Sequence, residues 1–262
     1  ALCRAERDPG GRATPLILAT FAALVACTPE AAPDRPGNEA PARPAIDWAP
    51  RSYVARPAAG PIRVDGILDE SAWRLAPWTE AFTDIEGSSR PPPPLLTRAK
   101  VLWNEEALWI GAEMEEPHVW GTLTERDAVI YLDDDFEVFL DPDGDTHAYY
   151  ELEINALGTE WDLLLVRPYR DGGPAIHAWD IPGLRTAVSV DGTLNQPEDM
   201  DRGWSVEIAI PWAALAEATE VPVPPRPGDR WRLNFSRVDW PVEIRDGKTV
   251  KRVDPGTGDT AA

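Results

Sequence analysis

Residues 204–210 read WSVEIAI, and this stretch decides the fold class because large apolar side chains alternate with smaller or polar ones along it. A β-strand places successive side chains on opposite faces, so the alternation predicts a strand with one buried face. The side chains expected on that face are Trp204, Val206, Ile208 and Ile210. Pro211 and Trp212 follow the strand, and a proline in a first turn favours a short helix over 211–218.

Other apolar-rich segments of strand length lie on both sides of this one. We expect them to form strands at 98–103, 108–113, 135–140, 147–155 and 231–238. Residues 104–107 (NEEA) and 141–145 (DPDGD) are typical of hairpin turns, and a third strand pair is expected across Gly158. A short helix at 69–73 is expected to be capped by Asp69. Many short strands with almost no helix predict an all-β fold, an antiparallel β-sandwich of two sheets.

The beginning of the chain has the features of a signal peptide. The apolar run 15–26 (PLILATFAALVA) is too short to span a bilayer comfortably as a helix. The basic residues before it are Arg4, Arg7 and Arg12. The run ends at 24–27 in LVAC, which resembles a bacterial lipobox, where a diacylglyceryl group is attached to the cysteine. We expect residues 1–27 to be a lipoprotein signal peptide and Cys27 to be lipidated; the alternative is a buried apolar helix that ends in cysteine.

The segments after Cys27 divide into a linker and a domain. Thr28 stands where an aspartate would favour retention in the inner membrane, so the resemblance implies anchoring in the outer membrane or at the cell surface of a bacterial envelope. Residues 28–50 are rich in Pro and Ala without apolar periodicity, which predicts an unfolded, semi-rigid linker. Residues 51–262 are expected to form one β-sandwich domain, whose end at Ala262 is either natural or a truncation.

Charge and cysteine content exclude two kinds of site. The 45 Asp and Glu against 25 Lys and Arg give a formal charge of −20, which repels phosphate backbones, so we expect no nucleic acid partner. Cys3 and Cys27 both precede the expected domain, so a cysteine metal site is excluded there. Zinc-binding spacing is absent from the three histidines, which are His118, His147 and His177, and the sequence has neither a GxSxG motif nor a phosphate loop. We therefore predict no catalytic residues.

A polar face is expected along the strand at 149–155. Alternation places four side chains on it: Tyr149, Glu151, Glu153 and Asn155. With Glu137 on the neighbouring strand, three carboxylates and an amide converge, which suits a polyhydroxylated ligand or a cation. The alternative is an outer sheet face that is merely solvated.

Aromatic and basic residues supply further candidates for ligand contacts. Trp161 and Trp240 could be stacking platforms, although tryptophans in a sandwich are more often part of the core. The guanidinium of Arg237 could bind a carboxylate or vicinal hydroxyls, or form a structural ion pair.

A turn rich in aspartate is a candidate calcium site. Asp141, Asp143 and Asp145 offer three oxygen ligands on a tight turn. Gly144 comes too early for an EF-hand, and Leu152 stands where a bidentate Glu is required. The alternative is an Asp-rich turn without an ion.

The order of six segments resembles the family 9 carbohydrate-binding modules and their bacterial family-9-like relatives. The segments are VDGILDESAW, AKVLWNEEALWIGAEMEE, DDDFEVFLDPDGD, YYELEINALGTEWDLLL, WSVEIAIPWAAL and WRLNFSRVDWP. The resemblance implies a DOMON-like, immunoglobulin-like antiparallel sandwich that holds sugar on a concave sheet face between aromatic side chains. It also implies calcium in a structural role.

The resemblance assigns roles to single residues. Tyr131 falls where the family has a sugar-stacking tryptophan, and Glu137 matches a carboxylate of the family's strand that could accept hydrogen bonds from sugar hydroxyls. Glu153 stands where the family has an arginine, so the charge is reversed. The family's second stacking tryptophan lies past the end of the matching segments, so either that half of the site is truncated or Trp240 replaces it.

Together these features predict a non-catalytic carbohydrate-binding module, tethered to a membrane and supporting polysaccharide breakdown. A glycan is the expected partner. One alternative is an enzyme domain that hydrolyses O-glycosyl bonds, with Glu137 and either Glu151 or Glu153 as acid and base. The other is a structural envelope lipoprotein that has kept the fold and lost the sugar site.

Overall fold

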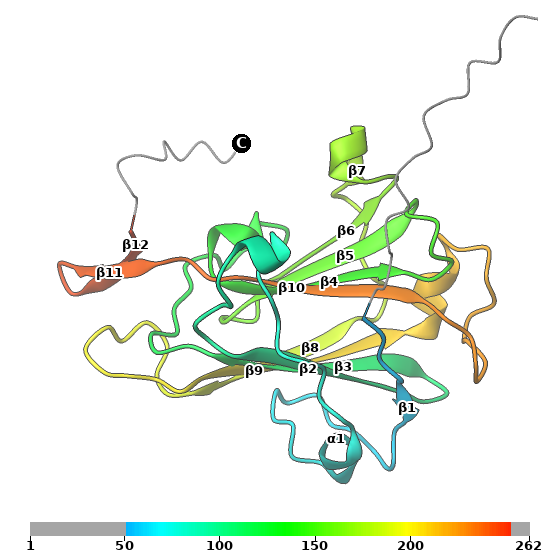
Figure 1. Ribbon diagram of the computed structural model, residues 1–262, viewed down its shortest axis with the longest axis horizontal. Coiled ribbons are helices and arrows are strands. Elements are labelled where there is room, and N and C mark those ends of the chain that lie inside the picture. The colour runs from blue at the N-terminus through cyan, green and yellow to red at the C-terminus, as the bar shows by residue number, and fades with distance from the viewer. Residues whose placement is uncertain (1–50, 253–262) are drawn as a thin grey trace, which may run out of the picture. The chain divides into compact units, whose positions relative to one another are not determined.

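A computed structural model describes residues 51–252, so Cys27, the expected signal peptide and the linker lie outside the described residues. Two five-stranded sheets form the domain (Figure 1). The first sheet has the order β1 (Arg56–Pro57), β2 (Thr97–Trp103), β3 (Ala107–Glu115), β9 (Gly203–Pro211) and β8 (Arg185–Asp191). The second has the order β10 (Arg232–Val238), β4 (Asp135–Asp141), β5 (Tyr149–Asn155), β6 (Glu160–Leu165) and β7 (Ala175–Ile176). Neighbouring strands are antiparallel except β1 and β2, so the predicted antiparallel sandwich is confirmed.

A separate hairpin and several short helices complete the described chain. The hairpin consists of β11 (Val242–Arg245) and β12 (Lys248–Lys251). The helices are α1 (Ser71–Leu75) and the 3₁₀ segments η1 (Gly87–Ser89), η2 (Ile130–Leu132), η3 (Tyr169–Asp171) and η4 (Trp212–Ala216). No helix in this part of the chain has the length and apolar character of a membrane span.

The expected cap of the first helix is wrong by one residue. Glu70, not Asp69, occupies the N-cap position, and its side chain makes no capping hydrogen bond. Its carboxylate instead accepts a hydrogen bond from the backbone N–H of Arg63 at 3.1 Å. The Glu70 carboxylate therefore binds the preceding loop instead of capping the first turn of α1.

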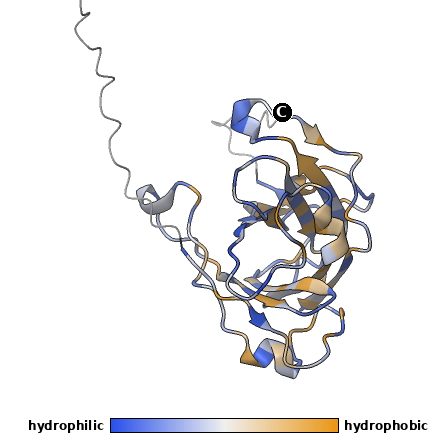
Figure 2. Cartoon of the chain, turned by 90° about the vertical axis from the view of Figure 1, so that its right-hand side faces the viewer, coloured by the Kyte–Doolittle hydropathy of each residue, from blue (hydrophilic) through white to orange (hydrophobic). Residues whose placement is uncertain are grey.

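The main core lies between the two sheets, and Figure 2 shows the hydrophobic residues concentrated on their strands. All four side chains that alternation assigned to the buried face of β9 are buried there: Trp204, Val206, Ile208 and Ile210. The second sheet contributes the inward side chains of β4 and β5, which are Phe136, Val138, Leu140, Tyr150, Leu152 and Ile154. Because the inward side is apolar, the alternate residues of β4 and β5 must point to the outer face of the second sheet.

The outer face of the first sheet is covered by the segment that contains α1. Glu207 of β9 is fully buried on this face and accepts hydrogen bonds from the backbone N–H groups of Asp65 and Gly66, both at 2.8 Å. The indole N–H of Trp73 donates to the same carboxylate at 2.6 Å. Gly66 has φ +84°, and a Cβ there would lie 2.6 Å from the backbone of Val188, so only glycine fits this turn. A single buried carboxylate thus fixes the covering segment to the sheet.

We expect Glu207→Gln to lower the free energy of unfolding by about 2 kcal/mol, because an amide N–H₂ would replace one acceptor facing buried donors. Urea denaturation measures the change. The control is Glu113→Gln, which removes only an ion pair with Arg98 that is open to solvent and should shift stability by less than about 1 kcal/mol. Equal effects of the two variants would show that Glu207 does not anchor the segment.

Candidate functional site

Four carboxylates gather on the outer face of the second sheet. Asp135 and Glu137 come from β4, and Glu151 and Glu153 come from β5. The register places Glu137 directly opposite Glu153. Their relative exposures are 0% for Asp135, 9% for Glu137, 3% for Glu151 and 2% for Glu153. We call these residues the acidic cluster. The convergence of Glu137, Glu151 and Glu153 that alternation predicted is therefore what the strands produce, and Asp135 adds a fourth carboxylate.

Loop residues cover part of the acidic cluster and donate to it. The backbone N–H of Tyr131, in η2, donates to Glu153 at 3.0 Å. The hydroxyl of Tyr169, in η3, donates to Glu151 at 3.0 Å. These contacts account for one oxygen each on Glu153 and Glu151, and they bring two tyrosines to the edge of the cluster.

Burial raises the pKa of every member of the acidic cluster, and repulsion from neighbouring carboxylates adds to this rise for Asp135, Glu151 and Glu153. Burial is the largest cause, and it raises the pKa of Glu153 to about 9, with the charges of Glu137 and Glu151 adding to the effect. The pKa of Glu151 rises to about 7 by burial, and those of Asp135 and Glu137 rise for the same reason. Among the ion pairs between described residues, none joins an arginine or a lysine to any of the four. Near neutral pH the cluster therefore favours bound protons, hydroxyl donors or a cation.

Aromatic side chains border the acidic cluster. Tyr131 is half-buried, and the indole N–H of Trp240 donates to its backbone carbonyl at 2.8 Å, so these two predicted stacking residues are neighbours. Tyr169 is 54% exposed. Trp161 lies opposite Glu153 in the register but is buried, with its ring tilted against Tyr131 at a centroid distance of 6.2 Å. The exposed ring of His177 stacks on it at 5.4 Å.

The expectation of Trp161 as an open stacking platform is corrected by this burial. Trp161 packs in a small apolar cluster on the outer face, whose other buried members are Ile130, Leu163 and Leu165. Nothing in the sequence indicated the η2 segment that covers this tryptophan. Aromatic rings that are half-buried or exposed on this side of the second sheet include Tyr131, Tyr169 and Trp240, together with Phe139 and Tyr149. The ammonium of Lys251 lies over the ring of Trp240 at 3.9 Å.

Asn155 shares the face of the acidic cluster but is not available to a ligand. Its side-chain N–H₂ donates to the carbonyl of Leu123 at 2.9 Å and to Asp133 at 3.1 Å. Its side-chain oxygen accepts from the backbone N–H groups of Leu157 and Thr159. The amide therefore shapes the β5–β6 turn, and the expectation of Asn155 as a sugar contact is corrected.

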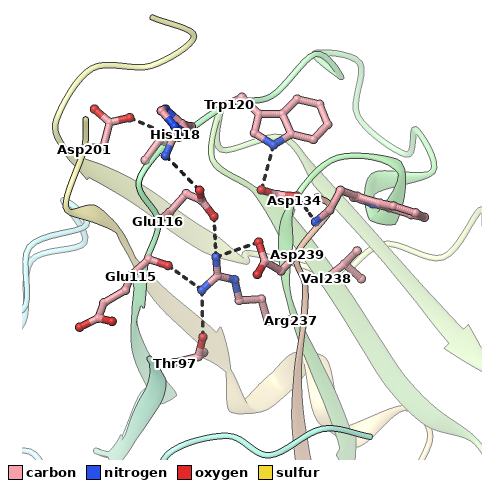
Figure 3. A network of polar contacts seen from close by, with 12 residues as sticks. Thr97, Glu115, Glu116, His118, Trp120, Asp134, Asp201, Arg237, Val238 and Asp239 are labelled. Atoms are coloured by element: carbon pink, nitrogen blue, oxygen red, sulfur yellow. Dashed lines mark hydrogen bonds and ion pairs between the residues drawn. The ribbon is translucent and has the colours of Figure 1, made fainter. Parts of the chain in front are cut away.

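Arg237 points away from the acidic cluster, into the space between the sheets. Figure 3 shows its guanidinium held by Glu116, Thr97 and the carbonyl of Glu115 at the ends of β2 and β3, with Asp239 also in contact. The ion pair with Glu116 measures 2.7 Å, and both side chains are 6% exposed. Of the two roles considered for Arg237, the structural ion pair is the one observed. The prediction that Arg237 contacts a sugar on the outer face is wrong, because its side chain lies between the sheets.

The Asp-rich turn forms as expected from its composition. Asp141 accepts hydrogen bonds from the backbone N–H groups of Gly144 at 2.8 Å and Thr146 at 2.9 Å. Asp141, Asp143 and Asp145 can each place one oxygen within 4.8 Å of the others. These hydrogen bonds account for an aspartate at position 141 without an ion, so calcium at this turn stays a prediction.

Two hollows of the described surface lie on the first sheet. They flank the loop at 61–64 and the start of β8, and Trp109 and Arg185 line one of them. Trp109 is buried, and Arg185 lies over its ring at 5.3 Å, so this aromatic face offers a ligand little surface. Accessible aromatic rings and acceptors occur together at the acidic cluster instead.

Tyr169 and Asp135 are candidate site residues that sequence reasoning did not identify. Asp135 lies two positions before Glu137, so the alternation that placed Glu137 on the outer face places Asp135 there as well. Tyr169 lies in a loop after β6, and no pattern in the sequence predicts that this loop returns over β5.

Comparison with known proteins gives one family. A family model described as carbohydrate family 9 binding domain-like matches residues 64–224. The chain is similar to a carbohydrate binding module family 9 from Caldicellulosiruptor kristjanssonii in complex with cellotriose, with 17% identity and a TM-score of 0.47 over 75% of this chain and 80% of that chain. A structure of such a module from the same organism in complex with glucose shows 17% identity and a TM-score of 0.46 over 74% and 81%. No curated protein matches the chain.

Proposed function

The chain belongs to the carbohydrate family 9 binding domain-like family and is a carbohydrate-binding module, and we propose that its sugar site is the outer face of the second sheet, at the acidic cluster. This location is supported by one observation: aromatic rings that are open to solvent lie next to nearly buried hydrogen-bond acceptors. Tyr131, Tyr169 and Trp240 border the site, while Glu137, Glu151 and Glu153 form its floor.

The chemistry of the two groups of side chains matches that of a sugar ring. Carboxylates accept hydrogen bonds from hydroxyl groups, and a buried carboxylate without a cationic partner gains most from such donors. Aromatic rings pack against the apolar C–H face of a pyranose and bury surface there. Glu137 keeps a small exposed fraction beside β10, where Asn234 is exposed on the same face. This edge gives a sugar access to the floor of the site.

The role that follows is binding without catalysis, in support of polysaccharide breakdown. Tethering through a lipid on Cys27 would place the module on the outside of a bacterial envelope, where polysaccharides occur. That part of the proposal rests on the sequence of the first 27 residues. Release of reducing sugar that depends on Glu153 would instead favour a glycoside hydrolase.

Isothermal titration calorimetry of the full chain with xylo-, cello- and manno-oligosaccharides tests the location. We expect saturable binding to one of these series, weakened about tenfold in Tyr169→Ala and at least as much in Tyr131→Ala, since one aromatic contact contributes about 1.4 kcal/mol. Tyr169 is the cleaner probe because its ring is more exposed.

The matched control is Trp78→Ala, because Trp78 is a half-buried aromatic that contacts Arg98 and Lys100 of β2 in the first sheet. Its replacement should leave the affinity unchanged. Binding that weakens in Trp78→Ala but not in either tyrosine variant would move the site to the first sheet. A folded chain that binds none of the oligosaccharides would support a structural envelope protein.

A further inference from the structure

The described residues contain four groups of three acids, and an arginine contacts three of these groups. Asp127, Asp162 and Asp180 all contact Arg126. Two other groups each contact a different arginine. Arg237 pairs with Glu116 and Asp239, which lie beside Asp134. Arg232 lies 3.8 Å from Asp141 in the Asp-rich turn. The fourth group is Asp135, Glu137 and Glu153, and none of the ion pairs between described residues involves it.

The negative charge of this fourth group is not balanced by any of the ion pairs between described residues, and its carboxylates are nearly buried. Glu151 adds a fourth carboxylate beside Glu153, and the four residues are at most 9% exposed. Like charges directly opposite each other across a ladder are destabilising, as Glu137 and Glu153 would be. Uncompensated buried carboxylates cost several kcal/mol in a protein interior, so the fold requires a neutralising partner.

The spacing of the oxygens fits a cation. Asp135, Glu137 and Glu153 can each place one oxygen within 4.8 Å of the other two. Calcium binds oxygen ligands at about 2.3–2.6 Å, so two ligands of one ion lie at most about 5 Å apart. The three oxygens can therefore lie in one coordination shell without a change of backbone.

An unpartnered oxygen gives a second, independent indication. Asp135 is fully buried, and its Oδ1 accepts a hydrogen bond from the backbone N–H of Val238 at 3.1 Å. Its Oδ2 is buried and has no hydrogen-bond partner among the described residues. A buried acceptor without a donor is uncommon in proteins, and an ion is one of the groups that satisfy it.

We propose that Asp135, Glu137 and Glu153 hold a divalent cation, Ca²⁺ by preference, beneath the outer face of the second sheet. The donor set is carboxylate oxygen alone, which suits a hard cation, and the flexible coordination of calcium suits three protein carboxylates better than magnesium, which demands near-ideal octahedral geometry and keeps several waters. The ion supplies the positive charge that an arginine supplies in the other three groups. It lies at the floor of the proposed sugar site, but its binding does not depend on sugar.

Calcium titration of the full chain without sugar tests the proposal. After treatment with a chelator, we expect one Ca²⁺ to bind per chain by calorimetry. Terbium should replace it and emit on excitation of tryptophan, because Trp161 lies on the same face, opposite Glu153. Glu137→Gln and Glu153→Gln should each weaken binding at least tenfold and abolish the sensitised emission.

We expect both variants to fold, because each removes a negative charge from the acidic cluster and keeps the shape of the side chain. Asp141→Asn is the matched control, since it removes a carboxylate from the Asp-rich turn, and it should leave calcium affinity unchanged. Loss of binding in Asp141→Asn with retention in both glutamine variants would place the ion in the turn and overturn the proposal. Absence of any calcium binding would also overturn it and leave protons as the neutralising partner.

The calcium proposal and the proposed sugar site can be rejected independently of each other. Tyr169→Ala is expected to weaken sugar binding and leave calcium binding unchanged, because its hydroxyl contacts Glu151 rather than the three proposed ligands. A chain that binds calcium but no oligosaccharide would retain this inference and reject the proposed sugar site.

Discussion

Replacing Arg237 by alanine is expected to lower the free energy of unfolding by about 3–5 kcal/mol, because it leaves buried carboxylates without their cation. The guanidinium extends from β10 of the second sheet and donates to Thr97, the carbonyl of Glu115 and Glu116 at the ends of β2 and β3 in the first sheet. Its side chain is 6% exposed, so water cannot replace the lost donors. Urea denaturation followed by tryptophan fluorescence measures the change.

The matched control for this variant is Arg202→Ala. Arg202 forms an ion pair of 3.2 Å with Asp191, but both side chains are largely exposed, and such pairs contribute about 1 kcal/mol or less. If Arg237→Ala were no more destabilising than Arg202→Ala, the network in Figure 3 would not hold the two sheets together.

The second large effect concerns pH. In the metal-free protein, stability is expected to fall as pH rises from about 5 to about 9. Burial raises the pKa of Glu151 to about 7 and of Glu153 to about 9, so the folded chain holds protons that the unfolded chain releases near pH 4.5. The folded state therefore binds more protons between these limits, and raising the pH in this window favours unfolding.

Thermal unfolding at a series of pH values, in the presence of a chelator, measures this dependence. Glu153→Gln is neutral at every pH and should flatten the decline, while Glu113→Gln, on an exposed side chain of the first sheet, should leave it unchanged. Calcium should restore stability at high pH, because an ion then replaces the protons. Stability that stays level or rises from pH 6 to 9 in the metal-free wild-type chain would contradict the assigned burial of the cluster.

Local pattern in the sequence was enough to predict the sandwich and the outer face of its second sheet. The WSVEIAI strand lies between β3 and β8 in the first sheet, and its four alternate apolar residues are all in the core. The period of two places Glu137 and Glu153 on the same face of β4 and β5, and the register pairs them directly. β8 and the β11–β12 hairpin were not predicted, because every residue of these strands is half-buried or exposed and none of the strands has a long apolar run.

What covers a face could not be predicted from the same pattern. Asn155 lies on the expected side of β5, and Trp161 lies on the same face of β6, but the segment from 121 to 132 folds over them and removes both from solvent. Arg237 pairs with Glu116, which lies 121 residues away in the sequence, directly after β3. Only the packing of the two sheets brings these two residues together. Long-range packing of this kind leaves no local periodicity in the sequence.

The location of the sugar site is the central claim, and the indole N–H signals of the tryptophans report on it directly in a ¹H–¹⁵N NMR titration with oligosaccharide. Trp240 and Trp161 lie at the acidic cluster, whereas the N–H of Trp73 donates to Glu207 on the outer face of the first sheet. We predict that the signals of Trp240 and Trp161 shift with saturation while that of Trp73 stays in place. Shifts confined to Trp73 and Trp109, or no shift with any oligosaccharide in the folded chain, would contradict the account.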